Sequence, residues 1–233
     1  KQAFEIADGL ENYIKKRLAQ RLSLGDQDVL LFNTDPTRFV SRKLIEVVTP
    51  SKKIKFDSKY KAVIVEETYT PSRPHIMQLT PNGYQFKDEP GYYQLKISLN
   101  VEMPGLGYKV IRFDNSQTEL SALKKQDGQE ISNRNLRLKF ENGRFDLSSN
   151  GHHYQNVIRI YDQANDGDTY DFSPLRDDHE IDLPWQGEIR KFSEKGLETL
   201  VLKGAWQLPY DLEDRKDKHG KQKEIPYCLT LSL

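Results

Sequence analysis

The acidic stretch at residues 162–182 has the residue types in this sequence that best suit chemistry. Its centre carries Asp166, Asp168 and Asp171 around Tyr170. Two carboxyl groups at a fixed separation serve a glycoside hydrolase as acid and base, and an aspartate-rich turn can bind calcium. Sequence does not fix the separation between two carboxylates, so a solvated acidic loop stays the alternative.

The calcium interpretation fails on spacing. Counted from Asp162, the third position of an EF-hand loop is Ala164 and the twelfth is Ser173. An EF-hand requires an oxygen ligand at the third position and a bidentate glutamate at the twelfth. The stretch is therefore not an EF-hand loop.

The histidines and the single cysteine do not form a catalytic or metal-binding motif. No histidine pair has the helical spacing, with an intervening Glu, of a zinc protease. His152 and His153 follow a turn, where neighbours on a strand point to opposite faces, so we expect exposed loop side chains. Cys228 lies in an alternating apolar run, and we expect a small buried side chain. Glycine-rich phosphate loops and the G-x-S-x-G elbow are also missing from the sequence.

The elements that must position the acidic stretch begin with a helix. Phe4, Ala7, Leu10, Ile14 and Leu18 follow spacings of three and four residues within residues 1–22, which predicts an amphipathic helix. One helix cannot bury its own apolar stripe. We therefore expect the last helix of a bundle whose other helices lie outside this sequence.

From Val29 onward the apolar period changes to two. Tyr93, Leu95, Ile97 and Leu99 alternate with polar residues, and the same pattern fills the last residues of the chain. Turn-forming pairs separate these runs: Asn82-Gly83, Pro90-Gly91, Asp127-Gly128, Asn142-Gly143, Asn150-Gly151 and Asp166-Gly167. The pattern predicts a mainly β fold of antiparallel β-sandwich regions, preceded by one amphipathic helix.

Three domains are expected along the chain. Residues 1–24 are the terminal helix of a bundle, and residues 28–115 form a small β-sandwich. Residues 131–233 begin a large β-sandwich that we expect to continue beyond Leu233 in a longer protein. The polar stretch at residues 117–130 marks the boundary between the two β-rich blocks.

Composition excludes several classes of partner. Lys plus Arg and Asp plus Glu each number 35, so there is no basic excess for nucleic acid. Mixed charged runs such as residues 215–223 are expected to be solvated loops. No apolar stretch approaches the roughly 20 residues that span a bilayer. The chain begins without Met, so its lack of a signal peptide carries little weight, and we expect a cytoplasmic location.

Four segments together resemble one enzyme family. Asn165-Asp-Gly-Asp-Thr-Tyr-Asp-Phe-Ser-Pro174 is similar to the GD-x-Y-x-[YF]-S-P signature in the β-region of bacterial α-mannosidases and mannosylglycerate hydrolases of glycoside hydrolase family 38. Leu30-Leu-Phe-Asn33 resembles the V-x-N strand that opens this region, and Pro104-Gly-Leu-Gly-Tyr108 resembles its P-x-x-G-Y segment. Residues 131–143 resemble its I-x-N segment with the following Asn-Gly turn. The four occur in the order of the family.

The resemblance implies a retaining α-mannosidase whose zinc ion is held by two His and two Asp in a catalytic domain preceding this region. One of those aspartates is also the nucleophile. None of those motifs occurs here, so no catalytic residue and no metal ligand is assigned, and the isolated chain is expected to be inactive. By resemblance, Tyr170 lines the sugar subsite with Asp168 and Asp171 as neighbours. The alternative is that Tyr170 and Phe172 pack into the sandwich.

Two other functions stay open at this stage. An independent carbohydrate-binding module would use Trp185, Trp206, Tyr92 and Tyr93 as its platform, although their strand positions favour the core. A structural interaction domain would use the apolar stripe of the first helix. The expected partner is an α-mannoside or mannosyl conjugate, with no nucleic acid and no membrane, and homo-oligomerisation is left open.

Overall fold

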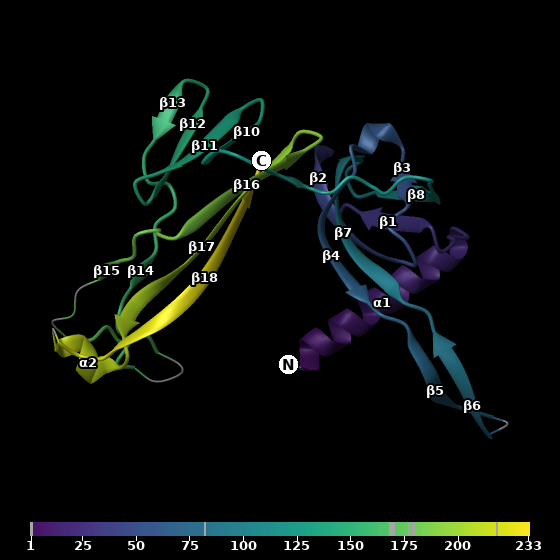
Figure 1. The fold of residues 1–233 in the computed structure, drawn as a ribbon, viewed down its shortest axis with the longest axis horizontal. Coiled ribbons are helices and arrows are strands. Elements are labelled where there is room, and N and C mark those ends of the chain that lie inside the picture. Colours follow the sequence, from purple (N-terminus) through teal and green to yellow (C-terminus); the bar gives the residue numbers. More distant parts are fainter. Residues whose placement is uncertain (1, 82, 168–170, 177, 179, 218) are drawn as a thin grey trace. The chain divides into compact units, whose positions relative to one another are not determined.

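The computed structural model describes residues 2–81, 83–167, 171–176, 178, 180–217 and 219–233, with side chains from residue 4 onward. The chain forms two compact units, Lys1–Leu123 (unit 1) and Lys124–Leu233 (unit 2), and each is described by itself (Figure 1). Strands dominate both units, the named strand pairs are antiparallel, and one long helix opens the chain. The predicted fold class is therefore confirmed. Whether the units coincide with the expected domains stays a prediction.

Unit 1 contains one long helix and eight strands among its described residues. They are α1 (Gln2–Arg21), β1 (Asp28–Phe32), β2 (Phe39–Thr49), β3 (Ile54–Phe56), the 3₁₀ turn η1 (Ser58–Tyr60), β4 (Val63–Thr70), β5 (Arg73–Thr80), β6 (Gly83–Glu89), β7 (Tyr92–Met103) and β8 (Tyr108–Asn115). The strands form two three-stranded sheets, in the orders β1-β8-β3 and β2-β7-β4, and the β5-β6 hairpin.

The two three-stranded sheets of unit 1 share one hydrophobic core. Along β7, Leu95, Ile97, Leu99 and Val101 lie on one face and are buried. They pack in the same cluster as Ile111 of β8, in the other sheet. The period-two pattern places every second side chain on the core face of a strand, as expected for a sandwich.

The β5-β6 hairpin continues β4 and β7 beyond the sandwich (Figure 1). Met77 is paired with Phe86, and Leu79 with Tyr84, so these four side chains share one face of the ribbon. All four are exposed. The hairpin thus presents an apolar face to solvent.

Helix α1 also exposes its apolar stripe. Phe4, Ile6, Leu10, Tyr13 and Ile14 are each more than half exposed. The stripe exists as the sequence predicts, but no described residue of unit 1 buries it.

Unit 2 contains ten strands and one short helix among its described residues. They are β9 (Lys124–Gln126), β10 (Glu130–Ser132), β11 (Leu136–Glu141), β12 (Arg144–Ser149), β13 (His152–Tyr154), β14 (Tyr161–Asp162), β15 (Ile181–Asp182), β16 (Glu188–Glu194), β17 (Leu197–Pro209), α2 (Leu212–Lys216) and β18 (Gln222–Ser232). The sheets have the orders β10-β11-β12-β13 and β18-β17-β16-β9, with β14-β15 as a separate pair.

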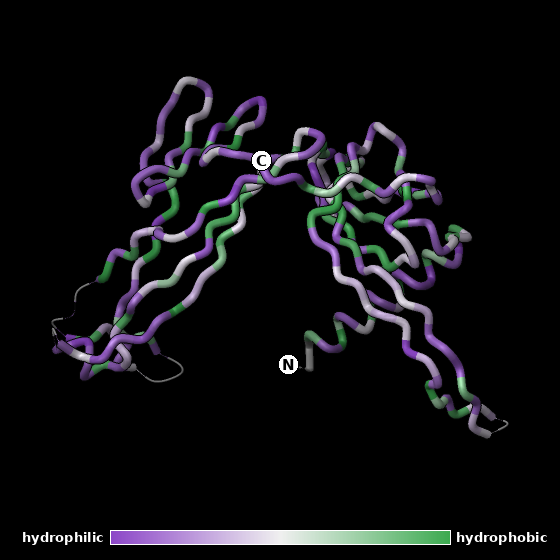
Figure 2. The backbone as a smooth tube through the Cα atoms, viewed as in Figure 1, coloured by the Kyte–Doolittle hydropathy of each residue, from purple (hydrophilic) through white to green (hydrophobic). Residues whose placement is uncertain are grey.

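The core of unit 2 joins its two four-stranded sheets. Ile131 and Phe145 from the first sheet lie in one cluster with Leu200 and Leu202 from β17, and all four are buried. Trp185 closes this core, with its ring 5.9 Å from that of Phe145 in an edge-on arrangement. Apolar and polar positions are interleaved along β17 and β18 (Figure 2).

Three hairpins of unit 2 have two-residue turns in which both residues have positive φ: Asn142–Gly143, Asn150–Gly151 and Lys195–Gly196. This geometry matches the twist of the flanking strands. The first two follow from their Asn-Gly sequence. The third is not predicted by the sequence, because Lys seldom takes this conformation.

Two expectations about single residues need correction. Cys228 is exposed, not buried. It lies on β18 between the core-facing Tyr227 and Leu229, so the same alternation turns Cys228 to the opposite face. His152 and His153 are exposed as expected, but they lie on β13 because the preceding turn starts a strand directly.

Candidate functional site

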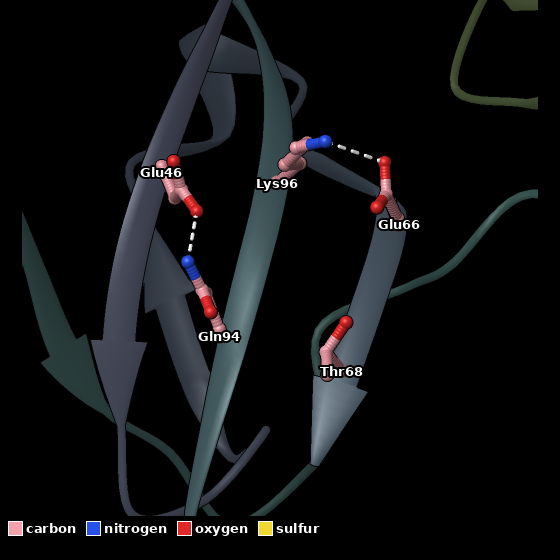
Figure 3. Close-up of a pocket in the computed structure, with 5 residues that line it drawn as sticks. All are labelled: Glu46, Glu66, Thr68, Gln94 and Lys96. Carbon is pink, nitrogen blue, oxygen red and sulfur yellow. Dashed lines mark hydrogen bonds and ion pairs between the residues drawn. The ribbon is translucent and has the colours of Figure 1, made fainter. Parts of the chain in front are cut away.

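The open face of the β2-β7-β4 sheet carries a polar pocket lined by Glu46, Glu66, Thr68, Gln94 and Lys96 (Figure 3). The strand register brings these residues together. Glu46 and Glu66 lie on either side of Lys96, and Thr68 lies opposite Gln94. A β-bulge between Ile64 and Glu66 aligns β4 with this row.

The polar groups of this pocket are hydrogen-bonded to one another. Lys96 Nζ lies 2.7 Å from Glu66 Oε2, and the Gln94 side-chain amide donates to Glu46. The hydrogen bond from Lys96 to Glu66, and then the attraction of Glu66 and Glu46, raise the pKa of Lys96. Cross-strand pairs of opposite charge stabilise a sheet. The pocket offers acceptors and one cation to a polar ligand, but no activated nucleophile.

The acidic stretch forms a second candidate site, in unit 2. Its base is the short β14-β15 pair, where Tyr161 is opposite Asp182 and Asp162 is opposite Ile181. Arg159 donates to Asp182 over 3.0 Å at the same base. The described acidic residues between Asp162 and Asp182 thus lie in a loop, called the acidic loop below, whose two ends meet in one small ladder.

Asn165 closes the described part of this loop. Its side-chain oxygen accepts hydrogen bonds from the backbone N–H groups of Gly167 and Ser173, both at 2.9 Å. The N–H of Asp166 donates to the Ser173 carbonyl over 2.8 Å. A Cβ at Gly167 would lie 2.1 Å from the carbonyl oxygen of Asp171, so the chain approaches too closely for any other residue. Asn165 and the first glycine of the signature, Gly167, therefore have a structural role.

The predicted substrate-binding residues are only partly described. Asp168 and Tyr170 lie outside the described residues. Asp171 is described and exposed, next to Phe172, which is 61% exposed. The alternative that Phe172 packs into the sandwich is therefore wrong, whereas a substrate role for Asp171 stays a prediction.

Arg215 is the residue of this region that the sequence does not reveal. The run that contains it was expected to be a solvated loop, but the Arg215 side chain is only 5% exposed. Its Nε donates to Asp178 Oδ1 over 2.7 Å, Nη1 donates to the Asp162 carboxylate, and Nη2 donates to the Asp162 carbonyl over 3.0 Å. These three residues are called the Arg215 network below. The partners of Arg215 come from the acidic stretch, which is distant in sequence. The charges along residues 215–223 therefore do not indicate that Arg215 is buried.

Hydrogen bonding sets the electrostatics of the Arg215 network. The hydrogen bond to Asp178, ahead of those to Asp162, raises the pKa of Arg215 even though burial opposes this. The second oxygen of Asp178 accepts from the Ala164 N–H over 3.1 Å. Two carboxylates and one guanidinium thus share their hydrogen bonds with the loop backbone.

The proposed aromatic platform belongs largely to the core. Trp185 is buried and its indole N–H donates to the Ile158 carbonyl over 2.8 Å. Trp206 stacks on Tyr227 with ring centroids 4.1 Å apart, and its N–H donates to the Pro184 carbonyl over 2.9 Å. These rings support the fold of unit 2 and leave little aromatic face for a sugar.

The described part of the chain contains neither a cluster of metal ligands nor a membrane-spanning helix. No three His, Cys, Asp or Glu side chains there are grouped so as to hold a metal ion. Of the described helices, none combines the length and apolar character needed to cross a bilayer.

Comparison with known proteins gives a likeness in fold. No family model and no curated protein sequence matches the chain. Among solved structures, the chain is similar to an alpha-mannosidase from Enterococcus faecalis V583, with a TM-score of 0.61 and 15% sequence identity. The match covers 99% of this chain and 32% of the mannosidase chain, so this chain spans under a third of that protein's length.

Proposed function

We propose that this chain is the non-catalytic β-rich region of a retaining, zinc-dependent α-mannosidase of glycoside hydrolase family 38, of the bacterial, mannosylglycerate-hydrolase-like type. The observation that carries the proposal is the likeness in fold to an α-mannosidase along 99% of the chain. The four ordered sequence segments support it independently, because that resemblance rests on residue identity alone. A cytoplasmic location belongs to the same proposal.

The structural roles of these segments agree with a scaffold. Asn33 is buried and links the segment 30–33 to Pro104 of the segment 104–108 by a hydrogen bond of 2.7 Å. The Asn133 side-chain oxygen accepts from the N–H groups of Asn135 and Leu136, both at 2.9 Å. Asn165 accepts hydrogen bonds within the segment 165–174 in the same manner. The asparagines thus hold turns and contacts between segments.

Within this proposal the chemistry belongs to a catalytic domain outside the chain, which supplies the zinc ion and the nucleophile. Tyr170, with Asp168 and Asp171 as neighbours, contributes one edge of the sugar subsite. An aromatic hydroxyl beside carboxylates offers both a face for sugar C–H groups and acceptors for sugar hydroxyls. The substrate is a terminal α-mannoside or a mannosyl conjugate.

The test compares the 233-residue chain with the longer protein that contains it. The longer protein is expected to hydrolyse an aryl α-mannoside with retention at the anomeric carbon, followed by NMR, and to lose activity on removal of zinc. The chain alone is expected to show no turnover. Turnover or stoichiometric zinc binding by residues 1–233 alone would contradict the proposal, as would a longer protein without mannosidase activity.

A binding module is distinguished by titration. A module should bind mannose or mannobiose without a catalytic domain, whereas the proposed region should show no saturable binding on its own. Isothermal titration calorimetry with both sugars separates the two. The buried position of Trp185 favours the absence of saturable sugar binding by the chain alone.

A structural interaction role is the second candidate, favoured by the exposed apolar stripe of α1. Phe4 and Leu10 are 78% and 58% exposed. A concentration-dependent dimer that is lost on combined Phe4→Asp and Leu10→Asp substitution would support this role. Sedimentation equilibrium showing a monomer for both forms would count against it.

A further inference from the structure

The Arg215 network joins three segments of unit 2. Asp162 ends β14, Asp178 lies on the returning side of the acidic loop, and Arg215 lies on α2 between β17 and β18. The guanidinium reaches both sides of the loop because its donors form a rigid fork. Arg215 is thus the described residue that bonds both sides of this loop to the sheet hairpin.

Helix α2 is itself held in place. Its N-cap residue, Asp211, accepts from the Asp214 N–H over 2.8 Å, and the Asp214 side chain accepts from the Lys221 N–H over 2.9 Å. A Cβ at Gly220 would lie 2.2 Å from the Asp214 carbonyl oxygen, so the turn after α2 packs closely on the helix. Arg215 therefore projects from an ordered support.

Burial of these charges calls for an explanation other than stability. The side chains of Arg215 and Asp178 are 5% and 6% exposed. A buried ion pair is often no more stabilising than apolar residues of equal volume, because both charges lose their hydration. What it supplies is a defined geometry, since each donor requires its acceptor at one place.

We propose that Arg215 is a positioning residue, which fixes the described backbone on the two sides of the acidic loop and thereby positions Asp171 for substrate. The link from the loop to substrate rests on the proposed function, because Asp171 is assigned to substrate there. The fixing of the loop by Arg215 concerns only this chain and is tested on this chain alone.

The first experiment measures hydrogen exchange by mass spectrometry in the 233-residue chain. Arg215→Met is expected to accelerate exchange of the backbone amides in residues 163–167 and 171–176 by roughly tenfold or more, with β16 and β17 unchanged. Arg215→Lys is expected to restore part of the protection, because it keeps the charge but loses the fork. Lys216→Met is the matched control: it removes the neighbouring cation, whose partner Glu213 lies on the same helix and is exposed.

Two outcomes would overturn the claim that Arg215 fixes the loop. Unchanged exchange of residues 163–167 and 171–176 in Arg215→Met would show that Arg215 does not hold the loop. Equally accelerated exchange throughout β16, β17 and β18, in Arg215→Lys as well as Arg215→Met, would show that it stabilises the whole unit.

The second experiment measures kinetics of the same variants in the longer protein. Loss of loop positioning is expected to raise KM for an aryl α-mannoside about tenfold while kcat changes less than about twofold, because the zinc and nucleophile are not moved. Faster loop exchange with an unchanged KM would overturn the link to substrate. A longer protein without mannosidase activity would instead overturn the proposed function, and the exchange result on Arg215 would stand.

Discussion

Asn33 and Pro104 are 71 residues apart in sequence, and a hydrogen bond of 2.7 Å joins the Asn33 side-chain amide to the Pro104 carbonyl. The same amide donates to the Thr37 carbonyl over 2.9 Å, and the Asn33 side-chain oxygen accepts from the Asp35 N–H over 3.0 Å. Asn33 is 6% exposed. One buried side chain therefore satisfies three backbone groups from two distant segments.

Replacing Asn33 by Asp is expected to destabilise unit 1 by about 3 kcal/mol, because the new carboxylate faces two carbonyl oxygens that lose their donor. Thermal unfolding followed by circular dichroism measures the loss. Asn115→Asp, at the exposed end of β8, is the matched control and is expected to change stability by less than about 0.5 kcal/mol. Equal stability of the two variants would contradict the role of Asn33.

Asp28 makes unit 1 sensitive to acid. Arg112 donates to it through Nε over 2.7 Å and Nη2 over 2.9 Å, and the Gly25 N–H donates over 2.9 Å. The hydrogen bond from Arg112, and then that from Gly25, lower the pKa of Asp28 from 3.8 to about 2. Because the pKa of Asp28 is lower in the folded state, ionised Asp28 contributes in full to the free energy of unfolding above pH 3.8. This contribution is lost as the pH falls to about 2.

In Asp28→Asn this part of the acid dependence is expected to disappear. The unfolding midpoint of unit 1, recorded by calorimetry across that pH window, is expected to fall less steeply than in the unsubstituted protein. Asp26→Asn leaves the Asp28–Arg112 pair intact and should keep the original slope. Parallel slopes for all three proteins would refute the assignment.

Phe145 and Phe172 form a matched pair within unit 2. Phe145 is fully buried, with its ring 4.9 Å from that of Phe140, whereas Phe172 is 61% exposed. Phe145→Ala is expected to cost about 3–5 kcal/mol, since it removes a core ring and leaves a cavity. Phe172→Ala is expected to cost less than about 0.5 kcal/mol. Urea unfolding of both variants measures the difference, and a comparable loss for Phe172→Ala would mean that this ring is packed.

Gly187 lies where no side chain fits. Its φ is +127°, and a Cβ there would lie 2.2 Å from the carbonyl oxygen of Lys203 on β17. Gly187→Ala is expected to destabilise unit 2 by about 3 kcal/mol or more, because both the conformation and the close approach are lost. Gly151→Asn is the control, since Gly151 has open space around it and Asn tolerates positive φ. A midpoint for Gly187→Ala equal to that of the control would disprove the constraint.

The fold was largely predictable because its information is local. The alternation of Leu95, Ile97 and Leu99 specifies which face of β7 is buried, whatever the partner strand. The Asn142–Gly143 turn follows equally from its own two residues. The exposed position of Cys228 was also accessible from the alternation, but the apolar character of cysteine suggested burial.

The candidate site was less predictable because it depends on contacts between distant segments. Nothing near Arg215 indicates that Asp162 and Asp178 surround it, 53 and 37 residues away. The pocket around Lys96 likewise requires the register of three strands, including the bulge in β4. Pairing of this kind is set by the tertiary fold, which residue types along one segment do not specify.

Both tryptophans of the chain, Trp185 and Trp206, belong to unit 2, where each ring packs against Tyr227. Intrinsic tryptophan fluorescence therefore reports on the packing of unit 2. Emission excited at the red edge of the indole band follows this packing without cutting the chain. The placement of two indoles thus gives the protein a built-in optical label for one of its halves.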